Sequence, residues 1–332
     1  MDRRELIRLG GLALAAAASG GPAFAQQKLV LKATDVHPLG YPTVEAVVRM
    51  GKKLEQATNG RLSIQMYPSM QLGGEKEMIE QAQVGALQIA RISVGPMGSI
   101  VDDLNVFNMP FVFRDVPHMN KVIDGAIGDE LLKKLTDAPT SKLVGLCWMD
   151  AGARSFYNSK KPIKTIDDLK GLKIRMMGNP IFVDTANAIG ANGIAMGFDQ
   201  LISALQTGVV DGAENNPPSY ESGKHYQFAK YYSLSEHLII PEILVFSRAS
   251  FDKMSKGDQE LVRKFGREAQ AEQRKLWQER EAASMAELKK QGIEIITFEP
   301  AEKAKFQAAV KPVWDKHGAK YTALVQRIQD VK

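Results

Sequence analysis

The chain lacks most of the short motifs that mark enzymes. A single cysteine, Cys147, excludes an intramolecular disulfide and any CxxC motif. There is no HExxH, GxSxG, P-loop or strand-following GxGxxG, and the five histidines never recur at i, i+4 spacing. We therefore expect no catalytic residues, no cofactor and no metal. A pair of catalytic carboxylates can be brought together by the fold alone, so the sequence does not exclude a glycosidase-like site.

No apolar run is long enough to span a membrane. The run at 9–18 falls well short of the ~20 residues that a spanning helix needs. It follows Arg3 and Arg4 and precedes Ala23-Phe24-Ala25, the pattern of a cleaved signal peptide without a lipid-attachment cysteine. We expect residues 1–25 to be removed and the mature protein to be periplasmic; Sec and twin-arginine export both fit.

An excess of charge of one sign is also missing. Lys and Arg number 43 against 38 Asp and Glu, a formal net charge of +5. Removing 1–25 takes away three arginines and two acids, which leaves +4. The lysines are spread along the chain instead of forming a stripe, so nucleic-acid binding has no support. The charged fraction of 24% and the hydrophobic fraction of 44% are typical of a folded soluble protein.

The length and the alternation of patterns predict an α/β protein with two lobes. A chain of 332 residues exceeds what one core usually supports. The first part alternates between predicted strands and helices, which indicates a mainly parallel sheet with its ligand crevice at the carboxyl ends of the strands. The predicted strands are 28–34, 61–67 and 87–93, and the helices are 42–59 and 75–84.

A second unit begins near residue 142. Its predicted elements are strands at 142–149 and 172–177 and helices near 181–189 and 199–206, with a strand at 239–247 returning to the first lobe. Ser255 caps a proline-free helix from 256 to about 290, which at 1.5 Å per residue spans about 50 Å and can cross both lobes. The predicted lobes are 26–151 plus 241–280 and 152–240 plus 281–332.

The segment 171–216 carries the clearest binding chemistry. The strand GLKIR ends in Arg175, and the predicted turn 211–216 presents Asn215. Arginine offers a rigid fork of donors that matches a carboxylate, and asparagine adds a donor and an acceptor for hydroxyls. This pair predicts a site for an acidic, hydroxylated small molecule.

These segments, in this order, resemble the extracytoplasmic solute-binding proteins of tripartite ATP-independent periplasmic (TRAP) transporters. The resemblance covers essentially the whole mature chain and implies a two-lobed periplasmic binding protein fold, with a ligand cleft between the lobes and a long C-terminal helix spanning both. It also implies hinge closure over the ligand and delivery to membrane subunits. The matching motifs are HPLGYPTVEA at 37–46, QLGGEKEMIEQ at 71–81, LKGLKIR at 169–175, NPIFVDTANAIGAN at 179–192 and LQTGVVDGAENN at 205–216.

The resemblance assigns four ligand-facing residues to the second lobe. Arg175 matches the arginine that pairs with the ligand carboxylate, and Arg154 matches a second ligand-facing arginine. Asn215 matches the ligand asparagine, although a turn-stabilising role explains it too. Phe198 occupies the place of an aromatic over the ligand, and a core aromatic is the alternative.

Three first-lobe residues match positions that line the cleft. They are His37, Glu75 and Arg91. Glu75 also suits the start of a helix, where the dipole favours an acid, and His37 also suits a loop before Pro38.

The stretches 214–222 and 235–237, together with 154–158, resemble the hexuronate-binding branch. The expected ligand is D-glucuronate or D-galacturonate, bound by a monomer. We expect neutral hexoses to bind worse, because burying Arg175 and Arg154 without an anion would leave both unpaired. Two alternatives stay open: an exported lyase or isomerase acting on a sugar acid, and a TRAP binding protein for another carboxylate.

Overall fold

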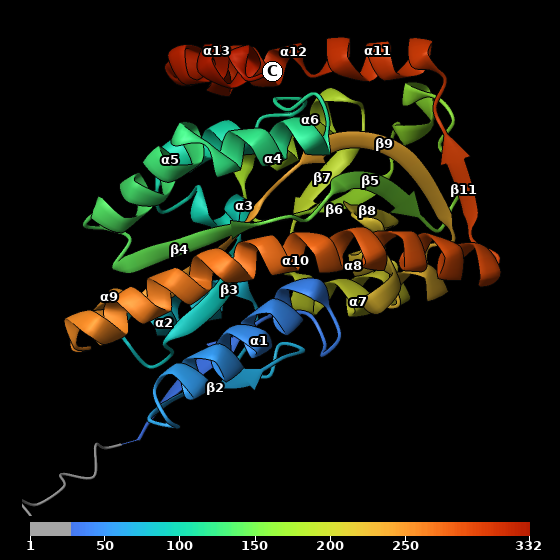
Figure 1. The fold of residues 1–332 in the computed structure, drawn as a ribbon. Helices are drawn as coiled ribbons and strands as arrows, with labels where there is room; N and C mark the ends of the chain where they lie inside the picture. The colour runs from blue at the N-terminus through green and yellow to red at the C-terminus, as the bar shows by residue number, and fades with distance from the viewer. Residues whose placement is uncertain (1–27) are drawn as a thin grey trace, which may run out of the picture.

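Two β-sheets, one in each lobe, organise the structure (Figure 1). The computed structural model describes residues 28–332, so the predicted signal peptide at 1–25 lies outside the described residues. One sheet has five strands in the order β2-β1-β3-β10-β4, and the other has six in the order β11-β9-β5-β8-β6-β7. The predicted two-lobed α/β architecture is confirmed.

The first sheet combines a parallel half with an antiparallel return. β1 pairs in parallel with both β2 and β3, as the alternation predicted, whereas β10 lies antiparallel between β3 and β4. Every residue of β3, β4 and β10 is buried, because helices or the other lobe cover both faces of these apolar strands. The bounds are β1 (Leu29–Thr34), β2 (Leu62–Tyr67), β3 (Ile89–Ser93), β4 (Leu143–Met149), β10 (Glu242–Ser247), α1 (Pro42–Ala57) and α2 (Glu75–Gln83).

The second sheet differs from the prediction in its short strands. The predicted turn at 211–216 is the buried strand β8, which pairs with β5 on one side and β6 on the other. The four-residue strands β7 and β11 carry too little alternation to be predicted. The bounds are β5 (Ala153–Asn158), β6 (Lys173–Met176), β7 (Asn192–Ala195), β8 (Gly212–Asn215), β9 (Tyr231–Ile239), β11 (Glu294–Thr297), α6 (Pro180–Ala188), α7 (Phe198–Thr207) and α8 (Pro217–Ser222).

The chain passes between the sheets at 150–152 and at 240–241, and α10 (Lys256–Lys290) runs alongside both lobes (Figure 1). This helix, with its Ser255 cap, has the predicted bounds, and it packs on α1, β4 and α8. Gln273 holds the first crossover: its Nε2 donates to the Asp150 carbonyl (2.7 Å), and its Oε1 accepts from the Asp150 N–H (2.8 Å). Gly152 has φ +61°, and a Cβ there would lie 2.8 Å from the Glu281 carboxylate. The crossover is thus tied to α10.

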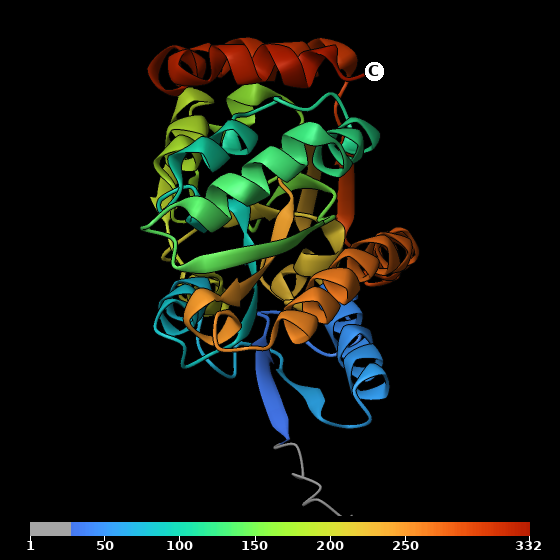
Figure 2. The same cartoon turned by 60° about the vertical axis from the view of Figure 1, so that its left-hand side comes forward.

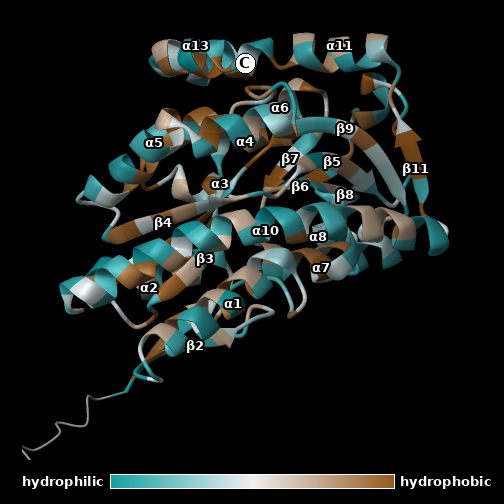
Figure 3. Cartoon of the chain, in the orientation of Figure 1, coloured by the Kyte–Doolittle hydropathy of each residue, from teal (hydrophilic) through white to brown (hydrophobic). Residues whose placement is uncertain are grey.

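Further helices cover the sheets, and the C-terminal helices form a layer along one end of the molecule (Figure 2). Hydrophobic residues are prominent on strands such as β4 and β11, whereas hydrophilic residues predominate on outer helices such as α10 (Figure 3). Cys147 is buried in β4, as predicted, and burial raises the pKa of its thiol to about 12. Across residues 28–332, no helix combines the length and the apolarity needed to cross a membrane. The remaining helices are α3 (Val94–Met97), α4 (Val116–Asp124), α5 (Ala126–Asp137), α9 (Arg248–Phe251), α11 (Pro300–Ala309), α12 (Lys311–Val313) and α13 (Thr322–Asp330).

Candidate ligand-binding site

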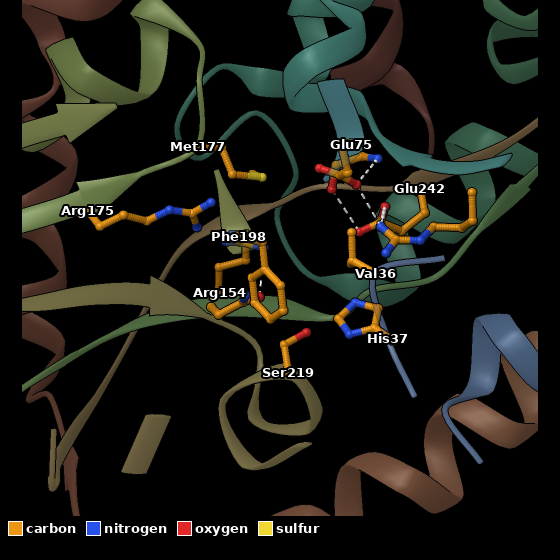
Figure 4. A pocket seen from close by; sticks show the side chains of 12 residues that line it. Val36, His37, Glu75, Arg154, Arg175, Met177, Phe198, Ser219 and Glu242 are labelled. Carbon is orange, nitrogen blue, oxygen red and sulfur yellow. Dashed lines mark hydrogen bonds and ion pairs between the residues drawn. The ribbon is translucent and has the colours of Figure 1, made fainter. Parts of the chain in front are cut away.

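A polar cavity lies between the lobes and is lined by residues from both of them (Figure 4). The structure brings all the residues predicted for the site to this one cavity: His37, Glu75, Arg91, Arg154, Arg175, Phe198 and Asn215. Five further lining residues were not predicted: Val36, Ser93, Met177, Ser219 and Glu242. Glu242 could not be found from sequence, because it reaches the cavity only through the antiparallel insertion of β10.

Arg175, on β6, is a buried cation without a partner anion. The residue is 2% exposed, its Nε donates to the Met196 carbonyl (2.8 Å), and its Nη1 has no hydrogen-bond partner in the described part of the chain. Among residues 28–332 it forms no ion pair. Burial lowers the pKa of its guanidinium, yet arginine titrates so far above neutrality that the charge persists. An anion in the cavity would therefore relieve an uncompensated charge.

Arg154, on β5, is already neutralised inside its own lobe. Its Nε and Nη2 donate to the two carboxylate oxygens of Glu214 at 2.6 and 2.8 Å, and Glu214 is fully buried. Burial disfavours the charged form, but the Glu214 carboxylate raises the pKa of Arg154 above its ordinary value. The expectation that both arginines lack an anion is therefore wrong for Arg154, because β5 and β8 pair and place Glu214 beside it.

Asn215, the last residue of β8, is oriented by this ion pair. Its Oδ1 accepts from Arg154 Nη1 (2.8 Å) and from the Asn216 N–H (2.9 Å). Its Nδ2 has no partner among the described residues and is left to donate. The second lobe thus presents free donors on Arg175 and Asn215.

The first lobe presents the opposite arrangement, with one arginine shared by three carboxylates. Arg91, on β3, contacts Asp35 at 2.6 Å, Glu75 at 2.9 Å and Glu242 at 2.6 Å. Glu75 is the first residue of α2 and also lines the cavity, so the two roles considered for it from the sequence are compatible. Its Oε1 also accepts from the Ser93 N–H (2.8 Å). Burial raises the pKa of Glu75, and Arg91 counteracts part of that rise.

His37 and Phe198 supply the flat surfaces. The His37 ring stacks on Tyr41 at 3.7 Å and meets Phe198 edge-on at 5.6 Å. Burial first, and then the charge of Arg91, lower the pKa of His37 to about 3, so the imidazole is neutral at pH 7. Its buried Nδ1 has no partner in the structure. His37 therefore combines an apolar face with a neutral polar atom.

A larger outer cavity adjoins the inner one. The two share Glu75, Arg175, Met177 and Phe198, which lie at the boundary between them.

Within residues 28–332, no group of three His, Cys, Asp or Glu side chains is arranged to hold a metal ion. The inner cavity combines arginines, carboxylates and a neutral histidine with the apolar side chains of Val36, Met177 and Phe198.

Solved structures of similar proteins share this architecture. A TRAP periplasmic solute-binding protein from Pseudomonas putida F1, with bound D-glucuronate, is 52% identical and superposes with a TM-score of 0.89, covering 92% of this chain and 98% of that one. One from a Bradyrhizobium species, in complex with D-galacturonate, is 45% identical with a TM-score of 0.87, covering 91% of this chain and 100% of that one.

A third relative, from Citrobacter koseri, is known in two forms. Its D-glucuronate complex has a TM-score of 0.89 at 45% identity, covering 92% of this chain and 100% of that one. Its ligand-free, open form has a TM-score of only 0.79 at 43% identity, covering 91% and 98%. The present arrangement of the lobes is therefore closer to the ligand-bound form, which agrees with the enclosure of Arg175.

The family model for bacterial extracellular solute-binding protein family 7 matches residues 33–321. This match spans both lobes, the cavity and the long helix, and with the structural neighbours it confirms the resemblance noted in the sequence. The chain belongs to the DctP family of extracellular solute-binding proteins, the type that serves TRAP transporters.

Proposed function

We propose that this protein captures a hexuronate, D-glucuronate or D-galacturonate, and delivers it to the membrane subunits of a TRAP transporter. The observation that carries the proposal is Arg175: a buried guanidinium that forms no ion pair among residues 28–332 and faces the cavity between the lobes. Three neighbours that contain D-glucuronate or D-galacturonate are 45–52% identical over nearly the whole described chain. A uronate carboxylate supplies the missing anion, and its hydroxyls supply partners for the rest of the wall.

The free polar atoms suggest how the ligand is held. The carboxylate pairs with Arg175, and Asn215 Nδ2 donates to the same end of the sugar. His37 and Glu75 bond hydroxyls on the first-lobe side, and Phe198 covers the ring. The paired cations Arg154 and Arg91 hold their neighbouring side chains in position, one in each lobe.

Capture proceeds by closure of the lobes. The hinge consists of the crossovers at 150–152 and 240–241, and we propose lobe boundaries at 26–151 plus 241–280 and 152–240 plus 281–332. Closing removes water from the ion pair at Arg175 and so strengthens it. The closed surface is then the form that the membrane subunits recognise.

We propose that the protein is exported to the periplasm, that its signal peptide is cleaved after Ala25, and that the mature protein acts as a monomer. Amino-terminal sequencing of exported material should begin at Gln26. An uncleaved product held in the membrane fraction would contradict this part of the proposal.

A thermal-shift screen over sugar acids, dicarboxylates and neutral hexoses tests the ligand. At 100 times its dissociation constant, a ligand stabilises the folded state by about 2.7 kcal/mol, which is readily detected. If a dicarboxylate raised the melting temperature and neither uronate did, the ligand would be a dicarboxylate and not a hexuronate. Recovery of the bound uronate unchanged after long incubation separates binding from the lyase or isomerase alternative.

A further inference from the structure

The two walls of the inner cavity differ in formal charge: Glu75 and Glu242 lie on one side of the cavity, and Arg175 lies on the opposite side (Figure 4). On the first-lobe side, Arg91 is outnumbered by Asp35, Glu75 and Glu242, a formal excess of two negative charges. On the second-lobe side, Glu214 cancels Arg154, and Arg175 remains as one uncompensated positive charge. The cavity is therefore polarised across its width.

Hydrogen-bonding capacity is divided in the same way. The second-lobe wall keeps free donors on Arg175 and Asn215. On the first-lobe wall, the Oε2 atom of Glu75 accepts no hydrogen bond from any described residue, so it is a free acceptor. Ser93, the neighbouring hydroxyl, already donates to Glu242 at 2.9 Å. This wall thus needs a donor from the ligand.

We infer that the first-lobe wall selects for ligands with one carboxylate and rejects those with a second carboxylate at the opposite end. The inference rests on the proposed function and adds to it the feature of the cavity that excludes sugar acids with two carboxylates. With the first carboxylate on Arg175, a hydroxyl at the far end donates to Glu75. A second carboxylate would bring an acceptor and a negative charge against an acceptor in a negative wall, and such a mismatch is the usual basis of rejection.

Three ligands of equal carbon number separate charge from shape. Glucuronate is a ring with one carboxylate, gluconate an open chain with one, and glucarate an open chain with two. In isothermal titrations at fixed pH and ionic strength, we expect glucarate to bind at least about 30-fold more weakly than gluconate, because like charges brought together in a binding site are strongly unfavourable.

Glu75→Gln removes one charge from the wall and gives it an amide that can donate. The gluconate-to-glucarate affinity ratio should then narrow by about 10-fold. The matched control is Glu80→Gln. It removes the same charge from an exposed position of α2 that lines the outer cavity but not the inner one, and it should leave the ratio unchanged. Glu242→Gln provides a second test from another strand if Glu75→Gln does not fold.

The outcomes are distinct. Glucarate binding as tightly as glucuronate would overturn the inference and leave the proposed function intact. Gluconate binding no better than glucarate would assign the rejection to the open chain and also overturn it. A ratio that stays at the wild-type value in both Glu75→Gln and Glu242→Gln would remove the wall as its cause. Failure of both glucuronate and galacturonate to bind would overturn the proposed function, and the inference with it.

Discussion

Both walls of the cavity contain buried arginines, but these arginines differ in whether a carboxylate of the protein neutralises them. In the first lobe, Arg91 is saturated by carboxylates, and in the second lobe Arg154 is held by Glu214. Arg175 alone among these three has no anion in the structure, although it is as deeply buried as Arg91. Burial alone therefore does not distinguish the three arginines. The missing partner singles out Arg175 as the arginine that we propose binds the ligand, because an internally paired arginine has little left to offer a ligand.

The largest effect should come from breaking the internal pair. Arg154→Ala leaves the fully buried Glu214 without its cation, and we expect it to lower the free energy of unfolding by about 3–5 kcal/mol. Arg175→Ala should not lower the stability of the ligand-free protein, since it removes a charge that nothing compensates. Denaturant unfolding of both variants without ligand measures the contrast, and equal losses would refute it.

Arg175→Ala should instead abolish most of the binding. Losing one partner of a buried charge pair costs about 2–5 kcal/mol, or roughly 30-fold to several thousand-fold in affinity for a uronate. Arg175→Lys should also bind poorly, because a point charge cannot reproduce the fork. Arg267→Ala, which removes an exposed arginine paired with Asp129, is the control and should titrate like the wild type. A loss below threefold in Arg175→Ala would remove Arg175 from the site.

A smaller effect is expected on the first-lobe side, at the neutral histidine. His37→Phe keeps the stacking on Tyr41 but deletes the unpartnered Nδ1, so one hydrogen bond to the ligand is lost. Affinity should fall by roughly 3- to 10-fold. Because the pKa of His37 is about 3, its titration should not alter wild-type affinity between pH 6 and pH 8. Wild-type affinity in His37→Phe would mean that this nitrogen faces no ligand atom.

The sequence indicated much of this fold and the positions of seven cavity residues, but not how they pair. The long α10 helix and the α/β alternation follow from strong local periodicity, and Arg175 lies in a motif that can be read directly. The Arg154–Glu214 pair joins residues sixty positions apart, and it exists only because Phe156 and Glu214 are register partners in β5 and β8. Such pairing depends on sheet order, which local patterns do not encode.

The smallest expected effect concerns the pH dependence of stability. It comes from Glu281, which lies outside both walls, beside the crossover between the lobes. Burial, followed by the charges of Asp150 and Glu236, raises the pKa of Glu281 from an ordinary 4.5 to about 7. The folded state therefore binds this proton more tightly than the unfolded state does. The resulting contribution to stability is fully present below about pH 4.5 and is lost as the pH rises to about 7, with no further change above.

Glu281→Gln isolates this contribution, because the amide stays neutral at every pH while keeping the size of the side chain beside Gly152 and Trp277. Urea unfolding of wild type and variant at pH 5, 6, 7 and 8 should show wild-type stability falling relative to the variant up to pH 7 and then running parallel. The difference should be modest, since the carboxyl group is partly open to solvent and water screens its charge. Because Glu281 touches neither wall, uronate affinity should respond to Arg175→Ala far more than to Glu281→Gln. Parallel stability curves across the whole range would show that the crossover does not hold a proton near neutral pH.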